Sequence, residues 1–200
     1  MNTILISGGT GLIGRHLSGL LKSKGYKVRL LSRESNPKNS FPTFLWNIDQ
    51  NTIDDSAFNG VNHIIHLTGA GVANKRWTNK RKNEILDSRV DSTNLLYDTV
   101  KRLEVPLKSF VAASATGYYG STTTDKIFKE TNKAGNDFLS NVCELWEKAI
   151  NQFEHLKIRT VILRTGIVLS KEGGALEKMT TPVITSIGNG KQFMPWIHID

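Results

Sequence analysis

The stretch "SGGTGLIGRHL", residues 7–17, decides the fold of this chain. It follows the apolar run "TILIS" (3–7), which is typical of a buried strand, and leads into leucines at helical spacing that end at Gly25. The next apolar run, "KVRLLS" (27–32), predicts a second strand. Strand, glycine-rich turn, helix and strand therefore follow one another within about thirty residues, the length of a βαβ unit.

The glycines of this turn have the spacing of a phosphate-binding loop, G-x-G-x-x-G, at Gly9, Gly11 and Gly14. One glycine permits the sharp bend, one lets backbone N–H groups approach a pyrophosphate, and one lets the helix pack closely on the strand. The start of the helix adds unpaired N–H donors and the positive end of its dipole. A tight turn without a ligand is the alternative, but the βαβ context favours a dinucleotide site. Its expected residues are Gly8, Thr10, Gly11, Leu12, Ile13 and Gly14.

The end of the second strand predicts which dinucleotide binds. Proteins that bind NAD usually place an acidic residue there, which accepts a hydrogen bond from the ribose 2′-hydroxyl. Ser32 and Arg33 occupy this place, and a hydroxyl and a guanidinium fit a 2′-phosphate better than a free diol. Glu34 follows one residue later and favours the diol instead. We therefore predict that the chain prefers NADP(H) to NAD(H).

The rest of the chain alternates between strands and helices. Further strands are expected at 43–47, 63–69, 109–114 and 158–164, and long helices at about 80–103 and 137–153. Apolar strands that alternate with helices predict an α/β fold, a Rossmann-type doubly wound parallel sheet. We expect residues 1–166 to form an NADP-binding domain and residues 167–200 to begin a small substrate-binding lobe.

Composition and charge limit the classes of function. The chain has 38% hydrophobic and 22% charged residues, which is typical of a globular protein, and no apolar run approaches the length of a membrane span. The net charge is +8, and the densest basic run is "NKRWTNKRK" (74–82). A solvated helix start or a clamp for an anionic cofactor explains this run better than nucleic acid does, because no nucleic-acid-binding motif accompanies it.

The single cysteine, Cys143, permits no internal disulfide and offers no metal-ligand spacing. A reducing compartment is consistent with this, and we expect a cytoplasmic protein without a metal. The expected partner is a small-molecule substrate, without nucleic acid or membrane, and a homodimer is left open.

Five further motifs carry a family resemblance. They are "ASATGYYG" (113–120), "ILRTGIVLS" (162–170), "MPWIHID" (194–200), "KRWTNKRKNEILDSRVDST" (75–93) and "FLSNVCELWEKA" (138–149). Together with the glycine turn they resemble an atypical, extended-type short-chain dehydrogenase/reductase of the epimerase-family group, over essentially the whole chain. The resemblance implies a Rossmann domain that binds NADP(H) and a smaller C-terminal substrate domain. Because such proteins continue for roughly a hundred residues after this point, we expect the lobe to be truncated here.

The resemblance also implies further cofactor contacts. They are Leu67, Thr68 and Gly69 after the fourth strand, Glu84 and Arg89 on the following helix, and Arg164 and Gly166 after the sixth strand. Arg89 would pair with a phosphate and Glu84 with a ribose hydroxyl. A surface network of ion pairs is the alternative for these two residues.

Catalysis is where the chain departs from the family pattern. The family uses a Tyr-x-x-x-Lys pair on the helix after the fifth strand, and the aligned positions hold Leu139 and Cys143, which cannot replace it. A Tyr-x-x-x-Lys does occur at Tyr97–Lys101, but we interpret it as a chance match because it lies on the preceding helix.

Hydroxyl groups after the fifth strand are possible substitutes for this pair. Ser114 would polarise a substrate oxygen, and Tyr118 or Tyr119 would donate a proton, although packing explains the tyrosines equally well. Two functions remain. The first is an NADP(H)-binding oxidoreductase or epimerase-like enzyme that acts on a small carbonyl or hydroxyl compound. The second is a non-catalytic protein that binds or senses NADP(H).

Overall fold

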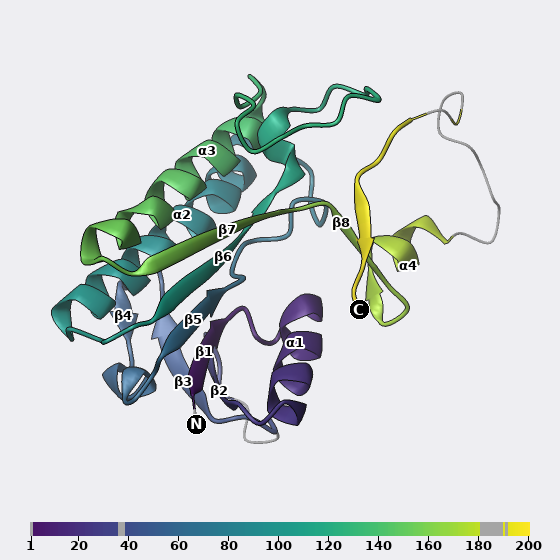
Figure 1. The fold of residues 1–200 in the computed structure, drawn as a ribbon. Coiled ribbons are helices and arrows are strands. Elements are labelled where there is room, and N and C mark those ends of the chain that lie inside the picture. Colours follow the sequence, from purple (N-terminus) through teal and green to yellow (C-terminus); the bar gives the residue numbers. More distant parts are fainter. Residues whose placement is uncertain (1, 36–38, 181–189, 191) are drawn as a thin grey trace.

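A computed structural model describes residues 2–35, 39–180, 190 and 192–200. Its main sheet has seven strands in the order β4-β3-β2-β1-β5-β6-β7 (Figure 1). The strands are β1 (Thr3–Ser7), β2 (Lys27–Ser32), β3 (Thr43–Asn47), β4 (Thr52–Ile53), β5 (His63–His66), β6 (Ser109–Ala115) and β7 (Arg159–Thr165). All neighbours pair in parallel except β3 and β4, which are antiparallel.

Helices cover both faces of this sheet. The helix α1 (Leu12–Ser23) lies on one face, and α2 (Asn79–Arg102) and α3 (Phe138–Asn151) lie side by side on the other (Figure 1). Short 3-10 helices follow or precede strands: η1 (Asp55–Phe58), η2 (Thr116–Tyr119) and η3 (Gln152–Leu156). Every residue of β1 is buried, which explains its uninterrupted apolar run. The predicted α/β, Rossmann-type doubly wound parallel sheet is confirmed.

The element boundaries differ from the sequence prediction mainly after β5. The strand expected at 63–69 ends at His66, although the N–H of Leu67 still donates to Ser7 O at 3.0 Å. Beyond that point the N–H and the carbonyl of Ala70 are hydrogen-bonded to side chains of α2, so they do not pair with a neighbouring strand. The strand β4 was not predicted because two residues show no periodicity.

The C-terminal segment forms a separate three-stranded sheet in the order β10-β8-β9 (Figure 1). Its elements are β8 (Ile167–Ser170), β9 (Gly173–Gly174), α4 (Ala175–Met179) and β10 (Trp196–His198). Gly166 separates β7 from β8, and a Cβ there would lie 2.7 Å from Pro195 O, so this close approach requires glycine. The proposed lobe includes residues 181–189 and 191, which lie outside the described residues, and the domain division remains a prediction.

Within the described ranges, no helix combines the length and the apolar character needed to cross a membrane.

Candidate cofactor cleft and active site

The order of the strands places a crevice at the carboxyl ends of β1 and β5. From β1 the chain builds β2 and β3 on one side and β5, β6 and β7 on the other, and ligands bind where the order reverses in this way. The glycine turn and the loop after β5 meet here. Gly8 has a φ of +75°, and a Cβ on it would lie 2.8 Å from Leu67 C and 3.0 Å from Thr68 N. The two backbones therefore touch and border one crevice.

The start of α1 is built to face an anion. A Cβ on Gly14 would lie 2.6 Å from Gly9 Cα, so the first turn of the helix packs directly on the glycine turn. Gly11 is the N-cap, without a side-chain hydrogen bond, and the first helical turn contains no acidic residue. The first N–H groups of a helix have no partner within the helix. Those of α1 are left for a negatively charged group.

The opposite border of the crevice holds an unsatisfied hydroxyl. Thr68 Oγ1 is buried and has no hydrogen-bond partner within the described part of the chain. Buried hydroxyl groups are nearly always hydrogen-bonded, so this one indicates a missing partner. A ribose or phosphate oxygen of a dinucleotide would supply it. The uncapped helix, the glycine contacts and Thr68 together fit a bound dinucleotide.

The end of β2 carries the groups expected to select the cofactor. Ser32 Oγ accepts a hydrogen bond from the N–H of Glu34 at 3.2 Å. The side chains of Arg33 and Glu34 are both exposed. The guanidinium of Arg33 is thus free to bind an approaching phosphate from solvent, as the predicted NADP(H) preference requires.

The centre of the active-site side is a buried ion pair that the sequence analysis missed. Glu147 on α3 accepts two hydrogen bonds from Arg164 on β7, at 2.8 and 2.7 Å, and a third from Ser114 Oγ at 2.6 Å. The hydrogen bond to Glu147 raises the pKa of Arg164 above its ordinary value. Because an ionised carboxylate only accepts, the single proton of Ser114 is committed to Glu147. Ser114, which is 4% exposed, therefore has no proton left with which to polarise a substrate carbonyl, and its oxygen can only accept.

Arg164 also orders the two candidate tyrosines. Its Nη1 donates to the hydroxyl of Tyr119 at 2.9 Å and to Glu130 O at 3.3 Å. Its Cζ lies 3.5 Å from the ring centre of Tyr118. The hydroxyl of Tyr119 donates in turn to Lys129 O at 3.1 Å. Most donors of Arg164 thus bind protein groups, and its contact with the cofactor stays a prediction.

The positions of the absent Tyr-x-x-x-Lys pair lie beside these tyrosines. A Cβ on Gly117 would meet Leu139 Cβ at 3.7 Å and Cys143 Sγ at 3.9 Å, so both side chains face η2. Burial raises the pKa of the Cys143 thiol, which keeps it protonated. The chance-match pair lies elsewhere on α2, where Tyr97 packs edge-on against Phe153 at 5.5 Å.

The expected cofactor contacts on α2 bind protein groups. Arg89 Nη1 donates to Ala70 O at 3.1 Å and to Ile85 O at 2.8 Å. Glu84 pairs with Arg81 at 2.6 Å, and about half of the Glu84 side chain is exposed. Among the described residues Glu84 thus forms a single ion pair with a protein group, and direct pairing of either residue with the cofactor stays a prediction.

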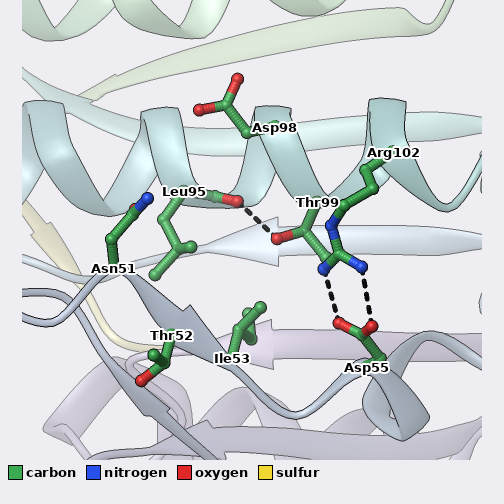
Figure 2. A pocket seen from close by; sticks show the side chains of 8 residues that line it. All are labelled: Asn51, Thr52, Ile53, Asp55, Leu95, Asp98, Thr99 and Arg102. Carbon is green, nitrogen blue, oxygen red and sulfur yellow. Dashed lines mark hydrogen bonds and ion pairs between the residues drawn. The ribbon is translucent and has the colours of Figure 1, made fainter.

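A groove of about 590 Å³ lies away from the crevice, between β4 and the C-terminal half of α2 (Figure 2). Arg102 faces Asp55 across it and donates two hydrogen bonds, at 2.7 and 2.6 Å. None of the predicted site residues lines this groove. It plays no part in the site.

Glu147 had a signal in the sequence that was not used. It lies on the apolar face of α3, together with the buried residues Val142, Cys143, Trp146 and Ile150. A lone carboxylate among residues that must be buried requires a cation, because an unpaired buried charge is costly. Which cation it meets is not visible from the sequence, since Arg164 follows 17 residues later on another element.

Comparison with known proteins agrees with this geometry. The model of the NAD dependent epimerase/dehydratase family matches residues 4–200. The chain belongs to that family. The Epimerase family protein ML0860 of Mycobacterium leprae is 33% identical over an alignment 202 positions long, which covers 98% of this chain and 64% of the relative. YfhF of Bacillus subtilis is 35% identical over an alignment 205 positions long, which covers 98% of this chain and 66% of the relative.

Solved structures of the family superpose closely. The nucleoside-diphosphate sugar epimerase from Corynebacterium glutamicum has a TM-score of 0.82 and 30% identity, over 99% of this chain and 41% of that one. Human epimerase family protein SDR39U1 (isoform 2), solved with NADPH, has a TM-score of 0.80 and 30% identity, over 98% of this chain and 66% of that one. The chain spans about two thirds of the length of the curated relatives. The resemblance to an atypical short-chain dehydrogenase/reductase is confirmed.

Proposed function

We propose that the chain binds NADP(H) in preference to NAD(H) and transfers hydride to or from a small carbonyl or hydroxyl compound. The observation that carries this proposal is the glycine turn before the uncapped start of α1, which contacts the backbone of Leu67 and Thr68 beside the unsatisfied Thr68 hydroxyl. The human SDR39U1 structure was solved with NADPH, which supports the same cofactor class. A bound nicotinamide supplies or accepts the hydride, and the protein must position the substrate and move its proton.

The residues of the crevice divide the work of binding. The free backbone N–H groups of residues 12–14 at the start of α1, beside the glycine turn, would hold the pyrophosphate, and residues 67–69 would contact the ribose hydroxyls. Ser32 and Arg33 would bind the 2′-phosphate. Glu84, Arg89, Arg164 and Gly166 complete the border of the cleft. A cytoplasmic location belongs to this proposal, because the one cysteine requires no oxidising compartment.

Tyr118 is the candidate proton donor among the three hydroxyls, because its proton is not engaged in the described part of the protein. The hydroxyl of Ser114 donates its hydrogen bond to Glu147, and the hydroxyl of Tyr119 donates its own to Lys129 O. Within the described ranges the hydroxyl of Tyr118 makes no hydrogen bond, so its proton is free for a substrate oxygen. Ser114 accepts from a substrate hydroxyl, and Tyr119 holds the loop at 129–130.

The test is a search for turnover. The chain is loaded with NADPH, mixed with a pool of cellular metabolites, and followed by the absorbance of the reduced nicotinamide. Loss of absorbance that Tyr118→Phe abolishes, while NADPH binding persists, would support hydride transfer with Tyr118 as donor. Turnover that survives in Tyr118→Phe but not in Ser114→Ala would move the chemistry to Ser114.

A non-catalytic protein that binds or senses NADP(H) is the second candidate. It is favoured by Leu139 and Cys143, which place an apolar group and a protonated thiol beside Gly117. A stable absorbance together with tight NADPH binding would favour this function. The search would then turn to proteins that bind only the loaded chain.

A further inference from the structure

The loop at residues 69–72 borders the cofactor crevice and is held by side chains of α2. The N–H of Ala70 donates to Ser88 Oγ at 2.9 Å, and the carbonyl of Ala70 accepts from Arg89 Nη1 at 3.1 Å. Both backbone groups of one residue are thus bound by two successive residues of one helix. The position of Ala70 is fixed with respect to α2.

The next two carbonyls of the loop are bound in the same way. Gly71 O accepts a hydrogen bond from Arg81, in the first turn of α2. Val72 O accepts one from Trp77 Nε1 at 2.9 Å, just before that helix. Three consecutive residues therefore depend on the segment 77–89. Part of the basic run thus points inward and binds this loop.

Arg89 is enclosed between the loop and α3. A Cβ on Gly69 would lie 2.9 Å from Arg89 Cζ, and Arg89 Cζ lies 5.2 Å from the ring centre of Trp146 on α3. None of the ion pairs among the described residues includes Arg89, and burial lowers the pKa of its guanidinium. A partly buried cation without a carboxylate partner is held by dipoles, here the carbonyls of Ala70 and Ile85.

We propose that Ser88 and Arg89 are positioning residues of the cofactor cleft, which fix the loop at 69–72, and Thr68 with it, against the glycine turn. This inference rests on the proposed binding of a dinucleotide. It gives Arg89 a task that acts through the backbone and needs no contact with a phosphate. A loop that is ordered before binding loses little conformational freedom when the dinucleotide binds, and the affinity is higher for that reason.

The test measures loop motion and affinity in the full chain. Hydrogen exchange of the peptide that contains residues 67–72 is followed without cofactor, and the dissociation constants of NADPH and NADH are measured by calorimetry. Ser88→Ala and Arg89→Gln are each expected to speed the exchange of this loop and to weaken both dinucleotides by the same factor, about threefold to tenfold. Ser88 is neutral, so its loss cannot act through charge.

Two control variants match these changes. Ser23→Ala removes a hydroxyl that, like that of Ser88, donates to a carbonyl three residues earlier in its own helix, but contacts no loop. Lys101→Gln removes one positive charge from the exposed far end of α2. Neither is expected to change the loop or the affinities, and the melting temperature of every variant is measured beside them.

Three outcomes would overturn the inference. The first is unchanged loop exchange in both Ser88→Ala and Arg89→Gln, and Ser88→Ala alone decides this if Arg89→Gln does not fold. The second is a loss confined to Arg89→Gln that disappears at high salt, which is the behaviour of a direct phosphate contact. The third is a wild-type chain that binds neither dinucleotide, which would overturn the proposed function as well. If the wild-type chain binds NADPH and the loop exchange is unchanged in Ser88→Ala and Arg89→Gln, this inference is overturned and the proposed function is not.

Discussion

The two halves of the candidate site are built from different groups. On the side of β1 and α1 the site consists of backbone: glycines that allow close contacts, and N–H groups at an uncapped helix. On the side of β6, α3 and β7 it consists of side chains, with Glu147 joining Ser114 to Arg164, and Arg164 joining Glu147 to Tyr119. A site made of backbone N–H groups requires only the correct conformation of the turn. A network of side chains requires that each of its residues is present.

This difference determines how each half responds to a substitution. A phosphate site made of N–H groups persists as long as the glycines do, and this chain has all of them. The chemical half tolerates exchange only as a unit, because removal of one charged member leaves the others buried and unpaired. At the positions where the resemblance implies a Tyr and a Lys the chain has Leu139 and Cys143, and the Glu147–Arg164 ion pair lies on neighbouring elements.

The largest expected effect comes from breaking the side-chain half. Arg164→Met leaves the Glu147 carboxylate buried without a cation, and should lower the free energy of unfolding by about 3 to 5 kcal/mol. The double variant with Glu147→Leu should recover most of this loss, as measured by denaturant unfolding. Arg102→Met breaks a similar pair with Asp55 at the surface and should change stability far less. An equal loss in both single variants would contradict the buried role of the Glu147–Arg164 pair.

The second prediction concerns His66, which links β1 to α2. This buried side chain contacts Ser7 Oγ at 2.5 Å and Thr93 Oγ1 at 3.1 Å, and burial lowers its pKa to about 3. The unfolded chain binds a proton below about pH 6.5 while the folded chain does not. As the pH is lowered from about 6.5 toward 3, the free energy of unfolding should therefore fall by about 1.4 kcal/mol for each pH unit.

The measurement is denaturant unfolding at several pH values between 7 and 4.5. His66→Gln should flatten the curve, whatever its stability at pH 7, because the titrating group is gone. His155→Gln changes an exposed histidine and should leave the curve as it is in wild type. A wild-type curve that is retained in His66→Gln would show that other groups cause the loss.

The third prediction tests the backbone half. Gly14→Ala places a methyl group against the backbone of Gly8 and Gly9, and should cost about 1 to 3 kcal/mol of stability and most of the NADPH affinity. Gly19→Ala is the matched control, because nothing lies within 4 Å of a Cβ at that position of the same helix. It should leave NADPH affinity unchanged. Tight NADPH binding by Gly14→Ala would show that the helix and the turn need not touch.

The smallest expected effect is one of cofactor choice. Arg33→Ala should weaken NADPH binding by about 1 to 2 kcal/mol, because a charge-assisted hydrogen bond to the 2′-phosphate is lost, and should leave NADH binding unchanged. Lys27→Ala removes an exposed charge from the other end of β2 and should affect neither. Fluorescence titration of both cofactors would measure this. Equal losses for NADPH and NADH in Arg33→Ala would remove Arg33 from the cofactor site.

The sequence by itself determined the backbone half of this protein. The strand–glycine–helix order and the glycine spacing are local features, and they predicted the α/β sheet, the turn at residues 8–14 and the dinucleotide site there. Such features depend on neighbouring residues, which the sequence displays directly.

Only the tertiary structure decided the chemical half. Ser114, Glu147 and Arg164 lie on three elements, and their hydrogen bonds join residues 17 and 33 positions apart. The structure also showed that the Ser114 hydroxyl donates a hydrogen bond to Glu147 and that Arg89 donates one to the carbonyl of Ala70. The physical reason is that a charge is paired with whichever group the packing of distant elements brings within about 3 Å, and no local pattern in the sequence encodes that distance.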